Sequence, residues 1–409
     1  MRAYERLIRY TKYPTVSDVK SPTCPSTPVQ LEFGKALVEE MLEIGIADAY
    51  QDEHGYVYGT IPATKADAKG PVIGFLAHMD VSGDAPCTPI TTRVIHNYQG
   101  GDVELSPGII MPAKEYQVLF ECIGDDLLIT DGTTLLGGDN KAGIAEILTM
   151  AEYLIKHPEI PHGTIKIGFT PDEEIGRGAD LFDVKGFGAD FAYTVDGGAF
   201  GEVEYETFSA FSAEVKIRGT SIHPGVAKNK MVNASEVAME FHAMLPAVER
   251  PEYTEQREGF YLLVEMSGII EEAKLSYIIR DHEDDLVERR VAQLERITKY
   301  LNERYEDDII TLEVKESYRN MRDIIKEHWH LIYNAYEAIE KIGGTPHSIP
   351  VRGGTDGSRL SFMGLPCPNL GTGSYNAHSR FEFANIQSMD KVVESLVEIA
   401  KLYTDWESN

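Results

Sequence analysis

Several kinds of residue and segment are scarce in this chain of 409 residues, and each scarcity excludes a class of protein. There are only four cysteines (Cys24, Cys87, Cys122 and Cys367) and no C-x-x-C pair, which argues against a disulfide framework and for reduced, mainly structural thiols. Basic residues number 38 against 66 acidic ones, and the net charge of −28 argues against nucleic acid or an anionic membrane surface as a partner. No apolar run reaches the length of about 18 residues expected of a membrane-spanning helix.

Two recognisable motifs are also missing. The first residues, Met1 to Ile8, lack the apolar stretch and cleavage site of a secretory signal, so we expect a cytoplasmic protein. No His-Glu-x-x-His occurs, which excludes the zinc peptidases built on that helix motif. The apolar content of 43% is ordinary for a soluble globular chain, and the length suggests two or more domains.

Up to about residue 207 the sequence alternates between helix and strand patterns. A helix is predicted from Thr27-Pro28 to Ile44, with Gln30 placed for a capping box. Residues 72–77 are almost uniformly apolar, as in a strand buried on both faces of a mainly parallel sheet. A helix from about Lys141 and strands at 164–170 and 191–195 continue the alternation. We therefore expect an α/β fold with helices on both faces of a sheet.

A different pattern occupies residues 208–318. Residues 208–218 alternate apolar and polar side chains, as a half-exposed antiparallel strand does. The elements predicted after it are a helix, two strands, a charged helix and a strand, at 234–245, 260–268, 274–282, 285–304 and 309–317. This βαββαβ order predicts a ferredoxin-like module. We expect a domain of residues 1–207 and 319–409, interrupted by an inserted α+β domain of residues 208–318.

Five segments place metal-binding residue types after predicted strands or in loops. They contain His78 with Asp80, Asp139, Glu173 with Glu174, Asp196, and His378. Ligands of open α/β sheets bind beyond the carboxyl ends of the strands, so these side chains are expected to meet. Two imidazoles with several carboxylates suit two Zn²⁺ ions that share a bridging carboxylate, although other divalent metals stay open. Hydrolysis is therefore the leading hypothesis.

Each segment also has an ordinary structural interpretation. A His-x-Asp such as His78 and Asp80 can place the carboxylate against the ring of a zinc ligand, or can arise by chance in a turn. Asp139 suits either a bridging ligand or a helix cap. Asp196, before two glycines, is also a turn signal, and His378 resembles an exposed loop histidine.

The pair Glu173-Glu174 has the same two interpretations. Neighbouring side chains of an extended chain point apart, so one glutamate can bind a metal while the other acts as a general base. The alternative is an acidic surface loop. Asp172, beside the pair, has no assigned role.

The combination of segments resembles the co-catalytic zinc peptidase family, which also contains aminoacylases, glutamate carboxypeptidases and dipeptidases. The similar strings are Gly-Phe-Leu-Ala-His-Met-Asp (74–80), Gly-Gly-Asp-Asn-Lys-Ala-Gly (137–143), Thr-Pro-Asp-Glu-Glu-Ile-Gly-Arg-Gly-Ala (170–179), Thr-Val-Asp-Gly-Gly (194–198) and Tyr-Asn-Ala-His (375–378). Further strings, among them 21–27, 97–102, 130–137, 277–281 and 351–357, resemble the tripeptide aminopeptidases of that family from end to end. The resemblance implies a three-layer catalytic domain with a mixed, mainly parallel sheet, and a ferredoxin-like lid as the insert.

The resemblance also implies a ligand set. One zinc would be held by His78 and Asp196 and the other by Glu174 and His378, with Asp139 bridging the two. The family usually has a second aspartate after the bridging one, whereas this chain has Asn140. Because the bridging role belongs to the first residue, metal binding is expected to survive, and what Asn140 affects is the fine tuning of the site.

Four further residues receive roles from the resemblance. Asp80 would orient His78, and Glu173 would be the general base. In the lid, His223 would stabilise the developing oxyanion, and Arg280 would grip the C-terminal carboxylate of the substrate, a task that suits its planar fork. An ordinary loop histidine and a salt bridge from Arg280 to Asp281 are the competing interpretations.

The expected activity is removal of the N-terminal residue from tripeptides. A related di-zinc exo-amidohydrolase (a dipeptidase, carboxypeptidase or aminoacylase) is the alternative, because the same metal site serves all of them. A catalytically inactive binding protein is disfavoured, since Glu173 and the ligands are all retained. Short peptides are the expected partners, and pairing of lid strand edges leaves a homodimer open.

Overall fold

The computed structural model describes residues 1–65 and 70–404, and its contacts divide the chain into two units. The large unit comprises Met1–Tyr205, Asp323–Ile349 and Thr355–Asn409, and the small unit comprises Glu206–Arg322 and Pro350–Gly354. The predicted division at 208 and 318 stays a prediction, and within it residues 66–69 and 405–409 lie outside the described residues.

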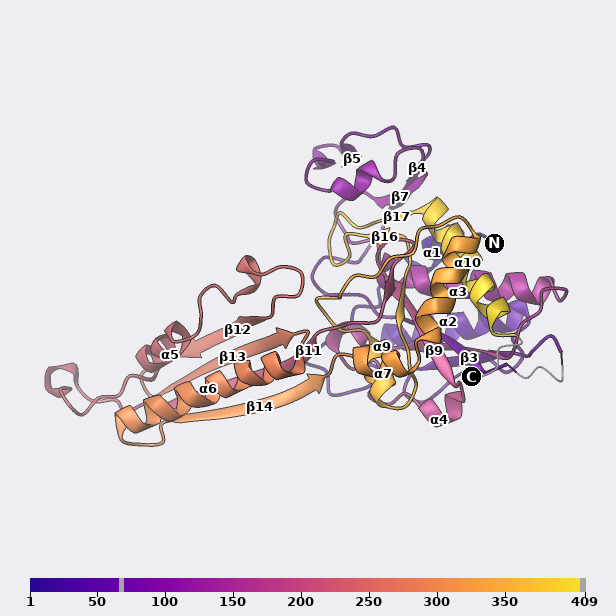
Figure 1. The fold of residues 1–409 in the computed structure, drawn as a ribbon. Coiled ribbons are helices and arrows are strands. Elements are labelled where there is room, and N and C mark those ends of the chain that lie inside the picture. Colours follow the sequence, from indigo (N-terminus) through magenta and orange to yellow (C-terminus); the bar gives the residue numbers. More distant parts are fainter. Residues whose placement is uncertain (66–69, 405–409) are drawn as a thin grey trace. The chain divides into compact units, whose positions relative to one another are not determined.

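A seven-stranded mixed sheet forms the centre of the large unit (Figure 1). Its strands, in spatial order, are β1 (Tyr50–Gln51), β2 (Val57–Ile61), β8 (Ile165–Thr170), β3 (Ile73–His78), β9 (Phe191–Gly197), β15 (Asn369–Gly371) and β10 (Val203–Glu204). The four central strands, β8, β3, β9 and β15, are parallel, and the outer pairs are antiparallel. Every residue of β3 is buried, which confirms the expectation from its apolar run.

Helices cover both faces of this sheet because successive strand residues point to opposite sides. On one face α3 (Gly138–Lys156) packs against β3 and β9, and α1 (Ala3–Tyr10), α2 (Pro28–Ile44) and α10 (Ile386–Leu402) contact α3. Leu76 and Ala192 belong instead to a core cluster with Phe187 of α4 (Val184–Phe187) and Leu360 of α9 (Asp356–Phe362). The three-layer α/β arrangement predicted for this domain is therefore confirmed.

A second group of strands was not predicted. A four-stranded sheet is formed by β16 (Ser374–Tyr375), β17 (Phe383–Asn385), β7 (Leu127–Thr130) and β4 (Thr92–Ile95). The hairpin of β5 (Val103–Ser106) and β6 (Ile109–Met111) shares a core cluster with it. The sheet matters for the site because His378 lies in the loop between β16 and β17. The remaining helices of the large unit include α8 (His330–Lys341), which packs against α10.

The capping box predicted at Thr27 and Gln30 is wrong. Helix α2 begins at Pro28, but the Thr27 hydroxyl donates to the Val16 carbonyl at 2.9 Å and accepts no main-chain N–H of the helix, only the Gln30 side-chain amide at 3.1 Å. The Gln30 side-chain amide donates to the carboxylate of Asp172 at 2.8 Å. The Gln30 side chain, which a capping box would use, therefore binds Asp172 instead.

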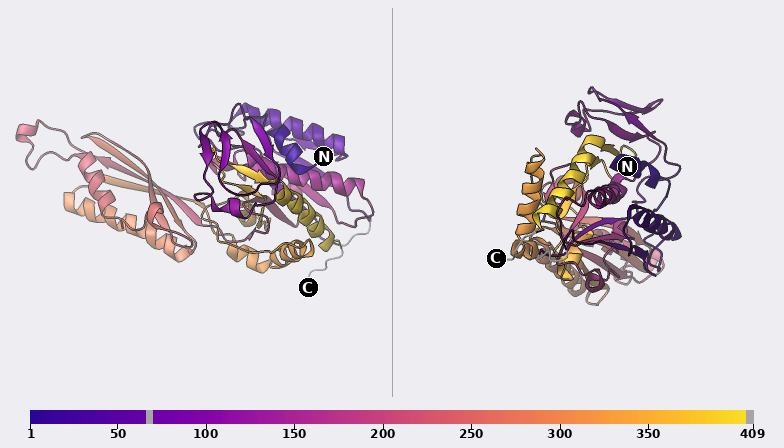
Figure 2. Two further views of the ribbon diagram at one scale, coloured as in Figure 1. Left: turned by 90° about the horizontal axis from the view of Figure 1, so that it is seen from above. Right: turned by 90° about the vertical axis from the view of Figure 1, so that its right-hand side faces the viewer.

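The small unit has the predicted ferredoxin-like order. Its elements are β11 (Ser209–Arg218), α5 (Ala234–Ala243), β12 (Phe260–Gly268), β13 (Glu272–Asp281), α6 (Asp284–Tyr305) and β14 (Ile310–Tyr318). The strands form an antiparallel sheet in the order β12-β13-β11-β14. Both helices pack on one face of it (Figure 2), where Val215, Leu275 and Leu294 are fully buried in a separate core.

A short segment from much later in the chain completes the small unit. The Val351 amide donates to the Glu206 carbonyl at 2.9 Å, and the Phe208 amide donates to the Gly353 carbonyl at 3.1 Å. Arg352 donates to the carbonyls of Gln256 and Glu258, both at 2.8 Å. Residues 350–354, here called the strap, are therefore held by main-chain bonds within this unit.

The helix that follows β14 is α7 (Arg322–Glu327). Among the described residues, no helix has both the length and the apolar character needed to cross a membrane.

Candidate active site

The carboxyl ends of three neighbouring parallel strands bring the predicted ligands together. His78 is the last residue of β3, the Glu173-Glu174 pair follows β8, and Asp196 is the penultimate residue of β9. Because β8, β3 and β9 are adjacent and parallel, their ends lie at the same edge of the sheet. Asp139, at the start of α3, completes this part of the cluster.

The distances place Asp139 between the two imidazoles. Its Oδ1 lies 2.9 Å from Nε2 of His78, and its Oδ2 lies 3.5 Å from Nε2 of His378. His78 Nε2 is also 3.3 Å from Oδ1 of Asp196. His378 Nε2 is 2.9 Å from Oε2 of Glu174. The five predicted ligands thus form one connected cluster, with each oxygen of Asp139 near a different histidine.

Two groups within the cluster have ligand atoms close enough to share an ion. They are His78 with Glu173 and Asp196, and His78 with Asp139 and Glu174, each group with its ligand atoms within 4.8 Å of one another. Glu173, expected as the base, therefore lies among the ligands, with Oε2 3.9 Å from Nε2 of His78.

The Glu173-Glu174 pair is not in extended chain, so that part of the prediction is wrong. Residues 173–175 form one turn of 3₁₀ helix, preceded by Asp172 and followed by Gly176, both in the left-handed region. The two side chains diverge because successive residues of such a turn point in different directions. Glu174 approaches His378, while Glu173 approaches His78.

Asp80 has more contacts than the prediction gave it. Its carboxylate is fully buried, with Oδ1 3.3 Å from Nδ1 of His78, although that nitrogen is nearer, at 3.0 Å, to the Asp80 carbonyl. The same carboxylate accepts the main-chain N–H groups of Glu173 at 3.0 Å and Glu174 at 3.1 Å. One side chain therefore contacts both the histidine and the glutamate turn.

The electrostatics of the cluster fit divalent cations. Burial raises the pKa of Asp196 to about 7 and raises that of Glu173 well above its ordinary value. Hydrogen bonding to Asp139, and then to Glu174, raises the pKa of His378 to about 11. In addition, Oε1 of Glu174 is buried and has no hydrogen-bond partner among the described residues. Several carboxylates packed together repel one another as anions, and bound cations would remove that repulsion.

Two carboxylates around the cluster were missed in the sequence. Glu382 is buried and accepts the main-chain N–H groups of Leu136 and Gly137, both at 2.7 Å, and of Asp139 at 2.9 Å. Asp356, also buried, accepts the Thr170 hydroxyl at 2.7 Å, and burial raises its pKa to about 6. Neither stands in a motif of metal ligands. The glycine-rich string at 351–357 was the available signal for Asp356.

Asn140 lies next to the bridging position and is fully buried. Its Oδ1 accepts the N–H of Gly143 at 3.3 Å, within the first turn of α3. The Asn140 side chain therefore caps a main-chain N–H near the start of α3.

The two predicted substrate-binding residues lie in the small unit. His223 is exposed, and its Nδ1 accepts the N–H of Gly225 at 3.1 Å. Arg280 donates from Nη1 to the carbonyls of Phe211 at 3.1 Å and Ile279 at 3.0 Å. The salt-bridge partner of Asp281 is Arg290, at 3.1 Å, which counts against the competing interpretation of Arg280.

Comparison with known proteins places this site in a family. Residues 205–309 match the family model of the peptidase dimerisation domain. The chain is 49% identical over 404 residues to peptidase T of Caldanaerobacter subterraneus subsp. tengcongensis, covering 98% of both chains. It is 50% identical over 403 residues to peptidase T of Clostridium botulinum (strain Hall), again covering 98% of both.

Solved structures share the fold along the whole chain. An aminopeptidase from Bacillus cereus gives a TM-score of 0.74 at 24% identity, covering 97% of this chain and 98% of that one. A tripeptidase from Staphylococcus aureus gives 0.76 at 21% identity, and a dinuclear metal-binding peptidase of the M20 family from Bacillus subtilis gives 0.63 at 14%. Both of these alignments cover 98% of each chain. Because relatives at 49% and 50% identity are matched over 98% of its length, the chain belongs to the peptidase T family.

Proposed function

We propose that this chain is a tripeptide aminopeptidase that uses two zinc ions. The observation that carries the proposal is the cluster of His78, Asp139, Glu174, Asp196 and His378, in which each oxygen of Asp139 lies near a different imidazole. Membership of the peptidase T family makes the chain a hydrolase of peptide bonds, and the tripeptidase from Staphylococcus aureus has the same fold. The family resemblance inferred from the sequence is confirmed by the comparisons.

The ligand assignment follows the distances. His78 and Asp196 would hold one zinc, Glu174 and His378 the other, and Asp139 would contribute one oxygen to each. Bound zinc supplies a Lewis acid for the peptide carbonyl and lowers the pKa of the attacking water. Asp80 would keep the His78 ring in place and would fix the main chain at Glu173 and Glu174.

Glu173 is the proposed general base. Burial raises the pKa of its carboxyl, which brings it closer to the range in which a group both accepts and returns a proton near neutral pH. In the proposed reaction a carboxylate oxygen of Glu173 takes a proton from the attacking water and passes it to the amine of the leaving dipeptide.

His223 and Arg280 are proposed to bind the substrate from the lid. Burial removes water from the Arg280 charge and so lowers its pKa, and an anionic partner would stabilise that charge. The C-terminal carboxylate of a tripeptide is such a partner. His223 would donate a hydrogen bond to the developing oxyanion.

The larger assembly is also proposed. We take residues 1–207 and 319–409 as the catalytic di-zinc domain and residues 208–318 as the lid. The match to the peptidase dimerisation domain supports a homodimer formed through the small unit. Short peptides in the cytoplasm would be the substrates.

A matched peptide panel tests the activity. We expect the zinc-loaded chain to cleave trialanine faster than dialanine or tetraalanine, and to release free alanine from the N-terminus. N-acetyl-trialanine, which lacks the free amine, is the control and should resist cleavage. Equal or faster cleavage of dialanine would contradict the tripeptidase assignment and favour a dipeptidase.

A further inference from the structure

Asp172 precedes the two glutamates of the site but belongs to no metal-ligand group. It follows β8 and stands at φ 61° and ψ 25°, in the left-handed region that few residues other than glycine and asparagine or aspartate adopt. The N–H of Arg177 donates back to the Asp172 carbonyl at 2.9 Å and closes the turn. The 3₁₀ turn of Glu173 and Glu174 therefore starts from the backbone conformation of Asp172.

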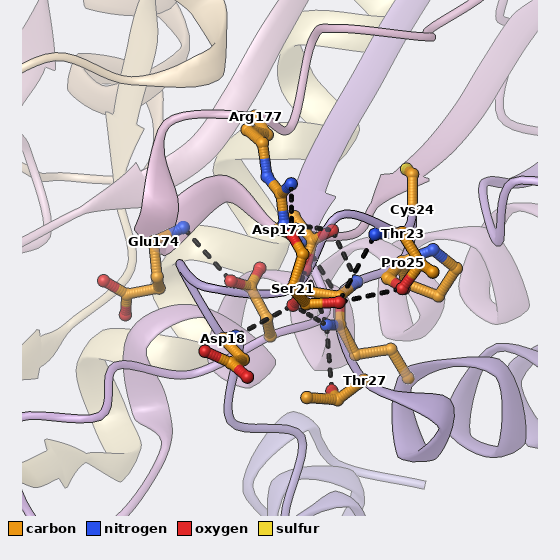
Figure 3. Close-up of polar contacts among 12 residues, drawn as sticks. Asp18, Ser21, Thr23, Cys24, Pro25, Thr27, Asp172, Glu174 and Arg177 are labelled. Atoms are coloured by element: carbon orange, nitrogen blue, oxygen red, sulfur yellow. Dashed lines mark hydrogen bonds and ion pairs between the residues drawn. The ribbon is translucent and has the colours of Figure 1, made fainter.

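The Asp172 carboxylate is fully buried and bonds to a segment about 145 positions earlier in the chain (Figure 3). Its Oδ2 accepts the Ser26 N–H at 2.7 Å, and its Oδ1 accepts the Ser26 hydroxyl at 2.5 Å and the Gln30 side-chain amide at 2.8 Å. The Asp172 N–H donates to Oε1 of Gln30 at 3.1 Å. Hydrogen bonds to an ionised carboxylate are among the stronger ones in proteins.

Arg177 joins the same two segments. Its Nη1 donates to the Ser21 carbonyl at 3.0 Å, and its Nη2 lies 3.7 Å from Oδ2 of Asp172 (Figure 3). Both ends of the turn are thus tied to residues 21–30. On its other side, the turn is held through its amides by Asp80.

We infer that Asp172 is a positioning residue, whose bonds to Ser26 and Gln30 hold the Glu173-Glu174 turn in place for zinc binding and proton transfer. This inference rests on the proposed function for the roles of the two glutamates. Asp80 fixes the amides of the turn, whereas Asp172 fixes the backbone that enters it. Loss of the carboxylate removes its three bonds to Ser26 and Gln30. The turn is then held less firmly, so Glu174 shifts relative to His378 and Glu173 relative to His78.

The test is Asp172→Asn in the full chain. Asparagine has the size of aspartate and tolerates a positive φ. Its side-chain NH2 group, however, replaces one carboxylate oxygen, so a hydrogen-bond donor would face the donors that this oxygen accepts. We expect zinc affinity, measured by competition with a chromophoric chelator, to fall about 10- to 100-fold. At saturating zinc, kcat on trialanine should fall by about tenfold or more, with KM changed by less than about threefold.

Glu40→Gln is the matched control. Glu40 is a buried carboxylate on α2, the helix that carries Gln30, and it accepts bonds from Arg6 at 2.8 Å and Tyr10 at 3.0 Å. It has no bond to the glutamate turn. The variant should lower the melting temperature, yet keep zinc affinity and kcat within about twofold of the wild type.

A polarity swap provides the rescue. In the double variant Asp172→Asn with Gln30→Glu, the new amide can donate to the new carboxylate, and the other oxygen of that carboxylate can still accept the main-chain N–H at position 172. We expect the double variant to bind zinc at least about tenfold more tightly than Asp172→Asn. If Asp172→Asn does not fold, Ser26→Ala, which removes only the hydroxyl bond, should show a smaller loss of zinc affinity in the same direction.

The outcomes separate this inference from the proposed function. Zinc affinity within about twofold of wild type in Asp172→Asn, or an equal loss in Glu40→Gln, would overturn the positioning role. A wild-type chain that binds zinc but leaves tripeptides intact would contradict the proposed function alone, because the zinc titration uses no peptide and still decides the role of Asp172.

Discussion

Glu173 and Glu174 are neighbours in the chain with different surroundings, and the difference predicts different consequences of substitution. Glu174 lies against His378, whereas Glu173 is 3.9 Å from His78. Replacing Glu173 with Gln keeps the size of the side chain and removes its capacity to accept a proton. We expect both metals to be retained and kcat to fall by about 10²- to 10⁴-fold, measured by metal analysis and steady-state kinetics on a tripeptide.

A surface glutamate serves as the comparison for that variant. Glu53 has an 88% exposed side chain, and Glu53→Gln should leave kcat unchanged. If Glu173→Gln retained activity within about tenfold of the wild type, another group would have to be the base.

At the scale of residues, the sequence predicted which side chains meet, and it predicted the contact of Asp80 with His78, but it did not predict Glu382. His78, Asp139 and Asp196 follow recognisable strand and loop patterns, so their convergence was predictable. Glu382 gave no such signal, because it stands between two phenylalanines in a strand-like pattern and its bond to Asp139 spans 243 positions. Contacts of that kind depend on tertiary packing, which local patterns do not encode.

Among the elements, α3 passes close to the sheet at Gly143. A Cβ at this position would lie 1.9 Å from the carbonyl oxygen of Val195 in β9, next to Asp196. We expect Gly143→Ala to destabilise the fold by about 1 to 3 kcal/mol, because overpacking exceeds the gain of about 1 kcal/mol in helix propensity. Urea unfolding measures the change.

Gly34→Ala in α2 is the control for that variant. There the added Cβ meets chiefly the end of the Gln51 side chain, which can move aside. A destabilisation as large as that of Gly143→Ala would indicate that the close approach to β9 is not the cause.

Helix α3 also contains a buried acid, Glu146, whose two oxygens have no hydrogen-bond partner among the described residues. Burial, and to a lesser degree Asp390, raises the pKa of Glu146 well above its ordinary value. Between the ordinary pKa of a glutamate and the raised pKa of the folded chain, Glu146 keeps a proton that the unfolded chain releases. The free energy of unfolding therefore falls as the pH rises through this range.

Glu146→Met removes this dependence. Relative to wild type, the variant should gain stability at up to about 1.4 kcal/mol per pH unit as the pH rises above the ordinary pKa of a glutamate. Urea unfolding of the metal-free chain at several pH values measures the difference, and metal removal eliminates the pH dependence of metal binding itself. A difference that stays constant with pH would show that Glu146 is ionised in the folded chain.

Elements with long periodic patterns were the predictable ones. The buried run of β3, the helix α3 and the six elements of the small unit all appear where the patterns placed them. The sheet of β16, β17, β7 and β4 did not, because its strands have only two to four residues and their pairing joins distant parts of the chain. The Glu173 turn was misjudged as extended because a single 3₁₀ turn is too short to show a period.

For the whole molecule, metal removal should lower the thermal stability of the large unit more than that of the small unit. All five proposed ligands lie in the large unit, and the small unit has its own core. Metal at about 100 times its dissociation constant stabilises the folded state by about 2.7 kcal/mol. We expect a chelator to lower the melting temperature of the large unit by about 5 to 10 °C and to leave the transition of the small unit in place, as measured by calorimetry.

Adding back zinc should restore the first transition, and magnesium, which binds few histidines, should not. An equal shift of both transitions would indicate that the units unfold together. No shift would indicate that the cluster holds no metal.

The insertion at 208–318 is predicted from the hydrophobic pattern, whose period changes near residue 208 and changes back near 318. The participation of residues 350–354 in the small unit was not predictable. Those residues stand in a glycine-rich string with no strand pattern, and only their main-chain bonds to Glu206 and Phe208 reveal where they belong.

Because the strap belongs to the small unit, residues 206–322 cannot be moved to another protein as a complete domain. A graft of residues 206–322 onto another protein would carry the βαββαβ order but would leave the Glu206 carbonyl and the Phe208 amide without the chain that pairs with them. A deletion of the same residues would remove the hydrogen-bond partners of the strap. The strap lies directly before Asp356, which accepts the Thr170 hydroxyl beside the site. A transplant of the small unit is therefore expected to need residues 350–354 as well as 206–322, although about thirty residues separate them.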